Sequence, residues 1–229
     1  KELESPDTWE VALSGGADKA ETFTRLLEER KLGALALLRN LRNMQQAGVD
    51  ETLIRQGLEN ARLDRVLPFR FITAAKYAPR LEGALEAAMF RCLDGMPKLP
   101  GKTVLVIDVS GSMGANLSVK SEMTRMESAF GISVLAREIC EDVQIYVTAG
   151  SDARRIHQTE LVPARRGFGL VDAMRQRYPN LGGGGIFLKQ CMDFVYAAEK
   201  GADRTIVFTD EQDCDVKANP ATANAFGKN

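Results

Sequence analysis

The stretch Thr103-Val-Leu-Val-Ile-Asp-Val-Ser-Gly-Ser-Met113 decides the fold of the second half of the chain. Its first five residues carry no charge and are mostly β-branched, as is typical of a strand buried on both faces of a sheet. Asp108, Ser110 and Ser112 then follow at a spacing of two. Open α/β sheets place their ligands beyond the carboxyl ends of their strands. The sequence therefore predicts a polar site at the edge of a buried sheet.

Strand and helix patterns alternate after this loop. Periodicity predicts helices over 120–141, 170–177 and 186–200, and strands over 143–149, 154–161 and 205–209. This alternation predicts a doubly wound, Rossmann-like α/β domain over residues 98–229. The residues beyond Asp215 are small and polar, so we expect this domain to be truncated at its C-terminus.

Residues 1–97 have a helical rhythm throughout. One predicted helix carries an apolar stripe at helical spacing, formed by Leu32, Leu35, Leu38, Leu41 and Met44. Another begins at Pro68 and ends before Pro79. Short helices joined by tight turns predict an α-helical repeat segment, HEAT-like in type. The Pro- and Gly-rich segment Met96–Lys102 marks the predicted domain boundary, which we place after residue 97.

The chemistry of the loop after 103–107 suits a hard cation. The Asp108 carboxylate and the Ser110 and Ser112 hydroxyls form an oxygen set appropriate to Mg²⁺. Asp210 ends another buried strand and adds a second carboxylate at the same edge. A serine-rich turn is the alternative for this motif taken by itself. The strand before it and the helix after it favour the metal site.

Composition narrows the function further. The 229 residues include 30 Lys and Arg against 31 Asp and Glu, a net charge of −1, so any nucleic-acid contact needs basic residues gathered on one face. Apolar runs are too short to cross a membrane and no secretory leader is present, so we expect a cytoplasmic protein. The 4 cysteines stand singly and His157 is the only histidine, which argues against a zinc site or a serine triad.

Catalytic motifs are incomplete. The glycine run 182–185 is not followed by the Lys-Ser/Thr pair of a phosphate-binding P-loop. Asp108-Val-Ser110 lacks the second aspartate of the aspartyl-phosphate enzymes, and no nucleophile elbow accompanies His157. We therefore expect no enzymatic activity. Asp213 and Asp215 are interpreted as a solvated acidic loop.

Two loops carry a family resemblance. Val106-Ile-Asp-Val-Ser-Gly-Ser-Met113 resembles the first metal loop of von Willebrand A domains, and Val207-Phe-Thr-Asp-Glu211 resembles their third. The resemblance implies that Ser110 and Ser112 bind Mg²⁺ directly, that Asp108 and Asp210 act largely through water, and that a partner carboxylate completes the site. The middle loop, 180–186, has glycine in place of the family's threonine, which implies weaker metal binding.

The helical half resembles a second family. Gly33-Ala-Leu-Ala-Leu-Leu-Arg-Asn-Leu-Arg-Asn-Met44, Leu67-Pro-Phe-Arg-Phe-Ile72 and the domain order are similar to the Ro ribonucleoproteins, whose helical module is called TROVE, and in particular to bacterial members. The resemblance implies that 1–97 is the closing part of a ring of helices, monomeric in its full-length form and closed by the A-type domain. It also implies small noncoding Y-like RNA, single-stranded ends of misfolded RNA and an exoribonuclease such as polynucleotide phosphorylase as partners, in RNA quality control.

Basic residues suited to RNA occur in this half. Arg39 and Arg42 lie three apart and so share one helix face, and Arg70 and Lys76 add charge further along. Guanidinium groups bind phosphates and stack on unpaired bases, although ordinary exposed or ion-paired residues would give the same pattern. The alternative function is a protein-interaction module that uses the metal site without binding RNA.

Overall fold

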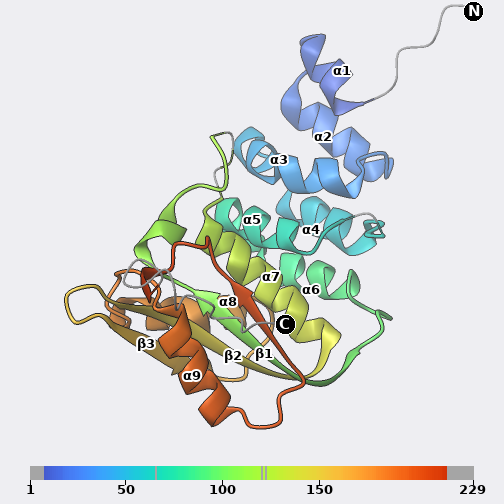
Figure 1. The fold of residues 1–229 in the computed structure, drawn as a ribbon. Helices are drawn as coiled ribbons and strands as arrows, with labels where there is room; N and C mark the ends of the chain where they lie inside the picture. Colours follow the sequence, from blue (N-terminus) through green and yellow to red (C-terminus); the bar gives the residue numbers. More distant parts are fainter. Residues whose placement is uncertain (1–7, 65, 120, 122, 216–229) are drawn as a thin grey trace, which may run out of the picture. The chain divides into compact units, whose positions relative to one another are not determined.

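A computed structural model describes residues 8–64, 66–119, 121 and 123–215 of the chain (Figure 1). The chain divides into two compact units between Asp94 and Gly95, close to the hinge predicted at 96–102. The first unit is helical and the second contains a β-sheet. Among the described residues, no helix has both the length and the apolar character needed to cross a lipid bilayer.

The helical unit is a series of short helices that pack against helices one or two places along the chain. They are α1 (Trp9–Ser14), α2 (Lys19–Glu28), α3 (Ala34–Ala47), α4 (Glu51–Asn60), α5 (Phe69–Tyr77), the 3₁₀ turn η1 (Pro79–Leu81) and α6 (Glu82–Arg91). Contacts join α2 to α3 and α4, α3 to α5, and α4 to α6. Their shared core is apolar, and its largest fully buried side chains include Phe23, Leu26, Leu37, Leu41, Met44, Ile54, Leu58, Phe71, Leu81 and Leu85.

Capping side chains and a glycine determine where several helices of this unit begin and end. The carboxylates of Asp18 and Asp50 accept hydrogen bonds from the first-turn amides of α2 and α4. Gly48 ends α3 with φ of 79°, a left-handed conformation that glycine adopts without strain. The predicted stripe was wrong at two positions: Leu32 precedes α3, and Leu35 is 39% exposed because the buried face includes Ala34 and Leu37 in its place. Leu38, Leu41 and Met44 are buried as predicted.

Within the described part of the chain, the second unit contains a four-stranded sheet with strand order β3-β2-β1-β4. The strands are β1 (Leu99–Asp108), β2 (Cys140–Ser151), β3 (Ile156–Leu161) and β4 (Arg204–Phe208). β1 pairs in parallel with β2 and β4, whereas β3 pairs antiparallel with β2. The sheet is therefore mixed, because β2 and β3 are joined directly by a short turn without a crossover helix.

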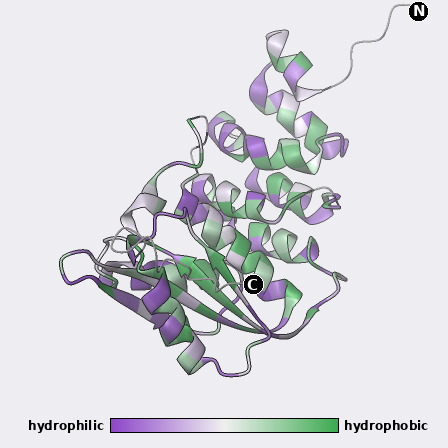
Figure 2. Ribbon diagram, viewed as in Figure 1, coloured by the Kyte–Doolittle hydropathy of each residue, from purple (hydrophilic) through white to green (hydrophobic). Residues whose placement is uncertain are grey.

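Helices cover both faces of this sheet. α9 (Leu188–Ala198) packs against a core face formed by Val104, Val106 and Tyr146. α7 (Arg125–Ile139) contacts β1 and β2, and α8 (Gly167–Arg177) packs on α7. Two 3₁₀ turns, η2 (Gly111–Gly114) and η3 (Tyr178–Asn180), lie in the connections. In Figure 2 the inner strands are coloured as hydrophobic while the helices carry both colours, as expected of helices with one buried face.

Most predicted elements of this unit have counterparts, with shifted ends. The helix predicted over 120–141 is observed as Arg125–Ile139, and Lys120 lies outside the described residues. The prediction that the domain is truncated concerns residues beyond Asp215, which also lie outside the described part of the chain.

Candidate functional site

The polar residues predicted at the sheet edge are gathered at the carboxyl ends of β1 and β4. These strands are parallel neighbours, with Ile107 opposite Phe208, so the loops that follow them leave the sheet side by side. We call the set formed by Asp108, Ser110, Ser112, Thr209 and Asp210 the strand-edge site. All four residues predicted from the sequence belong to it, and Thr209 is added by the structure.

Asp108 is fully buried, and both of its carboxylate oxygens accept hydrogen bonds. Oδ1 accepts from the backbone amide of Ser110 at 2.8 Å, and Oδ2 accepts from the hydroxyl of Thr209 at 2.7 Å. Burial raises the pKa of the Asp108 carboxyl above its ordinary value; the hydrogen bonds from Ser110 and Thr209 oppose the rise without cancelling it, and Asp210 adds to it. Asp108 thus joins the β1 loop to the end of β4.

The two serines of the first loop face each other. Ser110 is buried, and its Oγ lies 3.3 Å from the Oγ of Ser112. The short turn η2 holds this arrangement, with the amide of Met113 donating to the carbonyl of Ser110 at 3.0 Å. Both hydroxyls therefore lie together beside Asp108, as the spacing predicts.

Asp210 has a cationic partner that the sequence does not indicate. A guanidinium nitrogen of Arg125 donates to Asp210 Oδ2 at 2.5 Å, and the same nitrogen lies 3.4 Å from the carbonyl oxygen of Ser112. The Asp210 side chain is only 7% exposed, whereas that of Arg125 is 36% exposed. The Arg125 side chain therefore lies between the first loop and the end of β4.

The start of α7 fixes the backbone at Arg125. Thr124 and Glu127 form a reciprocal capping box, in which each side chain accepts a hydrogen bond from the other residue's amide. The amide of Arg125 donates to the carbonyl of Ala115 at 2.9 Å. The Thr-Arg-Met-Glu spacing is a sequence signal for this helix start, but the contact with Asp210, 85 residues away, has no local signal.

The middle loop reaches the site through its backbone. The carbonyl of Gly184 accepts from the amide of Gly111 at 3.2 Å, and the amide of Gly184 donates to the carbonyl of Gly150 at 3.1 Å. A Cβ at Gly184 would lie 2.7 Å from that carbonyl oxygen, closer than real contacts allow. Glycine is needed here by packing, and glycines 182–185 offer no side-chain oxygen.

The donors of the strand-edge site do not fit a six-coordinate metal in this arrangement. Asp210 is paired with a guanidinium, and both oxygens of Asp108 hold protein donors. The Mg²⁺ expected from Asp108, Ser110, Ser112 and Asp210 stays a prediction, and the cation that the arrangement does hold is Arg125.

Asp213 and Asp215 have a role other than the predicted solvated loop. Oδ1 of Asp213 accepts from the amide of Leu188 at 3.1 Å, and Oδ2 of Asp215 accepts from the amide of Gln190 at 3.2 Å. These amides belong to the first turn of α9, which lacks a cap from its own preceding residue. The two aspartates therefore cap α9 from a distant loop.

The basic residues predicted for RNA contact are exposed in the helical unit. Arg39 and Arg42 lie on α3, and Arg70 and Lys76 lie on α5. The guanidinium of Arg42 lies over the ring of Tyr77, 5.8 Å from its centre. This contact brings Arg42 close to the end of α5, where Lys76 precedes Tyr77 in the chain.

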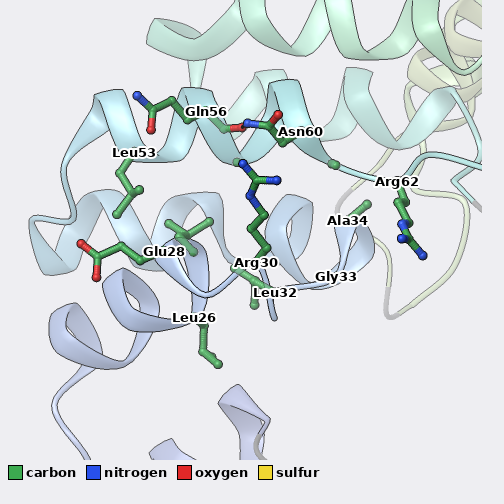
Figure 3. A pocket seen from close by; sticks show the side chains of 13 residues that line it. Leu26, Glu28, Arg30, Leu32, Gly33, Ala34, Leu53, Gln56, Asn60 and Arg62 are labelled. Carbon is green, nitrogen blue, oxygen red and sulfur yellow. Dashed lines mark hydrogen bonds between the residues drawn. The ribbon is translucent and has the colours of Figure 1, made fainter.

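A hollow of about 870 Å³ lies elsewhere in the same unit, between the end of α2, the α2–α3 connection and α4 (Figure 3). Its apolar lining includes Leu26, Leu32 and Leu53. Its polar lining consists of Glu28, Arg30, Gln56, Asn60 and Arg62. The sequence analysis did not single out this hollow, because its walls come from three separate segments.

Comparisons with known proteins connect both units to one family. Residues 1–136 match the model of the TROVE domain, a range that spans the helical unit and reaches through β1 into α7. The telomerase protein component 1 of Rattus norvegicus and that of Mus musculus are each 34% identical to this chain over 91 residues, which is 37% of the chain and 4% of each relative.

A solved structure, the RO (RSR) protein of Deinococcus radiodurans, has a similar fold. The TM-score is 0.57 at 22% identity, and the match covers 85% of this chain and 42% of that one. The chain therefore spans less than half of this structure and a small fraction of the curated relatives. The likeness supports an architecture in which a helical region is followed by an α/β region with a mixed sheet.

Proposed function

Because the chain belongs to the TROVE-domain family, we propose that it is an RNA-binding part of a Ro-type ribonucleoprotein. In this proposal the protein binds a small noncoding, Y-like RNA and the single-stranded ends of misfolded RNA. It acts as a scaffold, without catalysis, and an exoribonuclease such as polynucleotide phosphorylase is the partner that processes the RNA. The full-length protein forms a monomeric ring around which these partners assemble.

The observation that carries the proposal is the exposure of cationic side chains on a unit of family-matched helices. Arg39 and Arg42 project from α3, and Arg42 is stacked on Tyr77 of α5. A guanidinium that lies over an aromatic ring can still direct its N–H groups to a phosphate. With a net charge of −1, the protein as a whole does not attract RNA, so binding depends on such local groups.

The hollow beside α4 supports the same proposal. Arg30 and Arg62 are part of its lining, and neither has a described ion-pair partner in the ranges 8–64, 66–119, 121 and 123–215. Gln56 and Asn60 contribute carboxamides, and leucines form much of the remaining wall (Figure 3). Leucines, carboxamides and two guanidinium groups in one lining suit a base and its phosphate, and these two cations outnumber the one carboxylate of the lining, Glu28.

The test measures binding of the purified full-length protein to a structured RNA with a single-stranded 3′ end, by fluorescence anisotropy across a salt series. We expect binding that weakens steeply as salt rises, with a slope of about 0.7 per phosphate contacted on a single strand. Removing Arg39 and Arg42 together is expected to weaken binding roughly tenfold or more and to lower the slope by about 1–2.

A matched control removes the same charge from α9 and the turn that follows it. K189A/K200A takes two exposed lysines from the sheet unit and is expected to leave affinity unchanged. A further variant, R30A/R62A, asks whether the hollow contributes. The proposal fails if the wild-type protein does not bind at low salt, which would favour a protein-interaction module, or if the control weakens binding as much as R39A/R42A.

A further inference from the structure

The strand-edge site holds two carboxylates at the ends of paired strands, and one arginine lies against them. We propose that the guanidinium of Arg125 takes the place of a divalent cation at this site, so that the site is complete without metal. The inference concerns the sheet unit and is independent of the proposed RNA binding.

The first step is electrostatic. Asp108 is fully buried and the Asp210 side chain is 7% exposed, and both follow strands that pair in parallel. Two such carboxylates repel each other unless hydrogen bonds or a cation offset the repulsion. Hydrogen bonds from Ser110 and Thr209 stabilise the carboxylate of Asp108. The carboxylate of Asp210 is paired with a cation, because a guanidinium nitrogen of Arg125 lies 2.5 Å from its Oδ2.

The second step is the position of this arginine on its helix. Arg125 is the first residue of α7, where the helix dipole disfavours a positive charge. The capping box at Thr124 and Glu127 holds the backbone there regardless of the residue at 125. An arginine at this position is therefore accounted for by its contact with Asp210 and not by the helix.

The third step concerns the other oxygens that a metal would need. Ser110 and Ser112 place their hydroxyls 3.3 Å apart, within hydrogen-bonding distance of each other. The middle loop contributes a glycine backbone that is already bonded to Gly111 and Gly150. A metal bound to Asp210 would have to displace Arg125 and break its ion pair with Asp210. Residues 182–185 are glycines, so they provide no side-chain oxygen as a further ligand for that metal.

The experiment measures metal binding and stability of the full-length protein. Mn²⁺ is titrated and followed by electron paramagnetic resonance, and Mg²⁺ is added in thermal unfolding. The wild-type protein is expected to bind neither ion with a Kd below roughly 1 mM, and its Tm is expected to agree in EDTA and in Mg²⁺ to within ~1 °C. Binding at micromolar concentrations that D210N abolishes would overturn the proposal.

A double-mutant cycle tests the contact itself. R125A is expected to lower Tm by roughly 5–10 °C, because it leaves Asp210 without its cation, and R125K is expected to restore part of the loss. In a D210N background the same R125A substitution should shift Tm by less than half as much. R154A, which removes an exposed arginine from the β2–β3 turn, is the control and should have no effect.

Equal Tm shifts for R125A in the two backgrounds would refute a specific pairing with Asp210. If R125A alone does not fold, the comparison of R125K, D210N and the wild-type protein still decides, since the metal titrations of these proteins do not require the alanine variant. A wild-type protein that is stabilised by Mg²⁺ would contradict the proposal whatever the variants show.

Discussion

Asp108 shows how one buried acid organises the loops around it. Its two oxygens bind the Ser110 amide and the Thr209 hydroxyl, which come from different loops. Because burial raises its pKa, the folded protein holds a proton on this group more tightly than the unfolded chain does. The resulting stability is fully present below the unfolded-state pKa and is lost as the pH rises through the folded-state pKa.

The substitution Asp108→Asn tests this pH dependence. Asparagine keeps an oxygen for the Ser110 amide, and its NH₂ group can donate to the Thr209 hydroxyl, while the buried charge is removed. We therefore expect the Tm of D108N minus that of the wild-type protein to be more positive at pH 8 than at pH 4, in thermal unfolding across that range. The exposed D172N serves as control. A difference that does not change with pH would contradict the argument.

The close packing around Gly184 leads to a second prediction at the residue scale, about stability. A methyl group at this position would overlap the Gly150 carbonyl, which cannot move without disturbing β2. We expect G184A to lower the free energy of unfolding by roughly 1–3 kcal/mol in urea denaturation. The matched control is G83A on α6, where a Cβ meets nothing within 4 Å; it should be neutral or stabilising by about 0.4–1 kcal/mol. Equal effects of the two substitutions would refute the packing role.

The residues of the strand-edge site could be predicted only in part. Asp108, Ser110 and Ser112 share one loop, and Asp210 ends a recognisable strand, so spacing and hydropathy place all four. Thr209 and Arg125 make their contacts 101 and 85 residues away along the chain. Such contacts depend on strand order and helix placement, which no local pattern encodes.

At the scale of single elements, α7 is the helix that matters most for the site, because it begins at Arg125. Its N-terminus is fixed by hydrogen bonds between Thr124 and Glu127. The helix start is therefore set locally, independently of the sheet beneath it. Periodicity places the helix well but begins it at residue 120, before the observed start at Arg125, because the position of the cap and not the apolar period sets the first turn.

Thr124→Ala should weaken this start. Loss of the capping hydroxyl is expected to lower the free energy of unfolding by about 1 kcal/mol, which corresponds to a Tm shift of roughly 2–4 °C. Thermal unfolding followed by circular dichroism measures the shift. T52A, which changes an exposed threonine in the first turn of α4 that forms no cap of its own, is the comparison and should cost less. If both substitutions have the same effect, the capping box does not stabilise α7 as described.

At the scale of the whole molecule, the chain is close to neutral, with a net charge of −1, and its two units differ in their hydrophobic pattern. The helical character of the first unit and the α/β character of the second follow from hydrophobic period, which changes near the Pro-rich hinge. The antiparallel β3 departs from the predicted fold, because a short turn reverses the chain where a helix would be needed for a parallel neighbour. The short turn between the two predicted strands can be recognised in the sequence. That it makes β3 an antiparallel neighbour of β2 is established by the structure.

The placement of β4 beside β1 has a consequence for synthesis of the chain. β1 is an apolar strand whose partner on this side, pairing Thr103 with Arg204, is made about a hundred residues later. Until β4 has been synthesised, the backbone N–H and C=O groups along one edge of β1 have no strand to pair with. Unpaired edges of apolar strands can pair with other chains and so promote aggregation. The first turn of α9 is likewise capped only after Asp213 and Asp215 have been synthesised. A nascent chain that stalls before Arg204 would therefore carry an unpaired edge on β1, and we expect it to associate with other chains more readily than the complete sheet does.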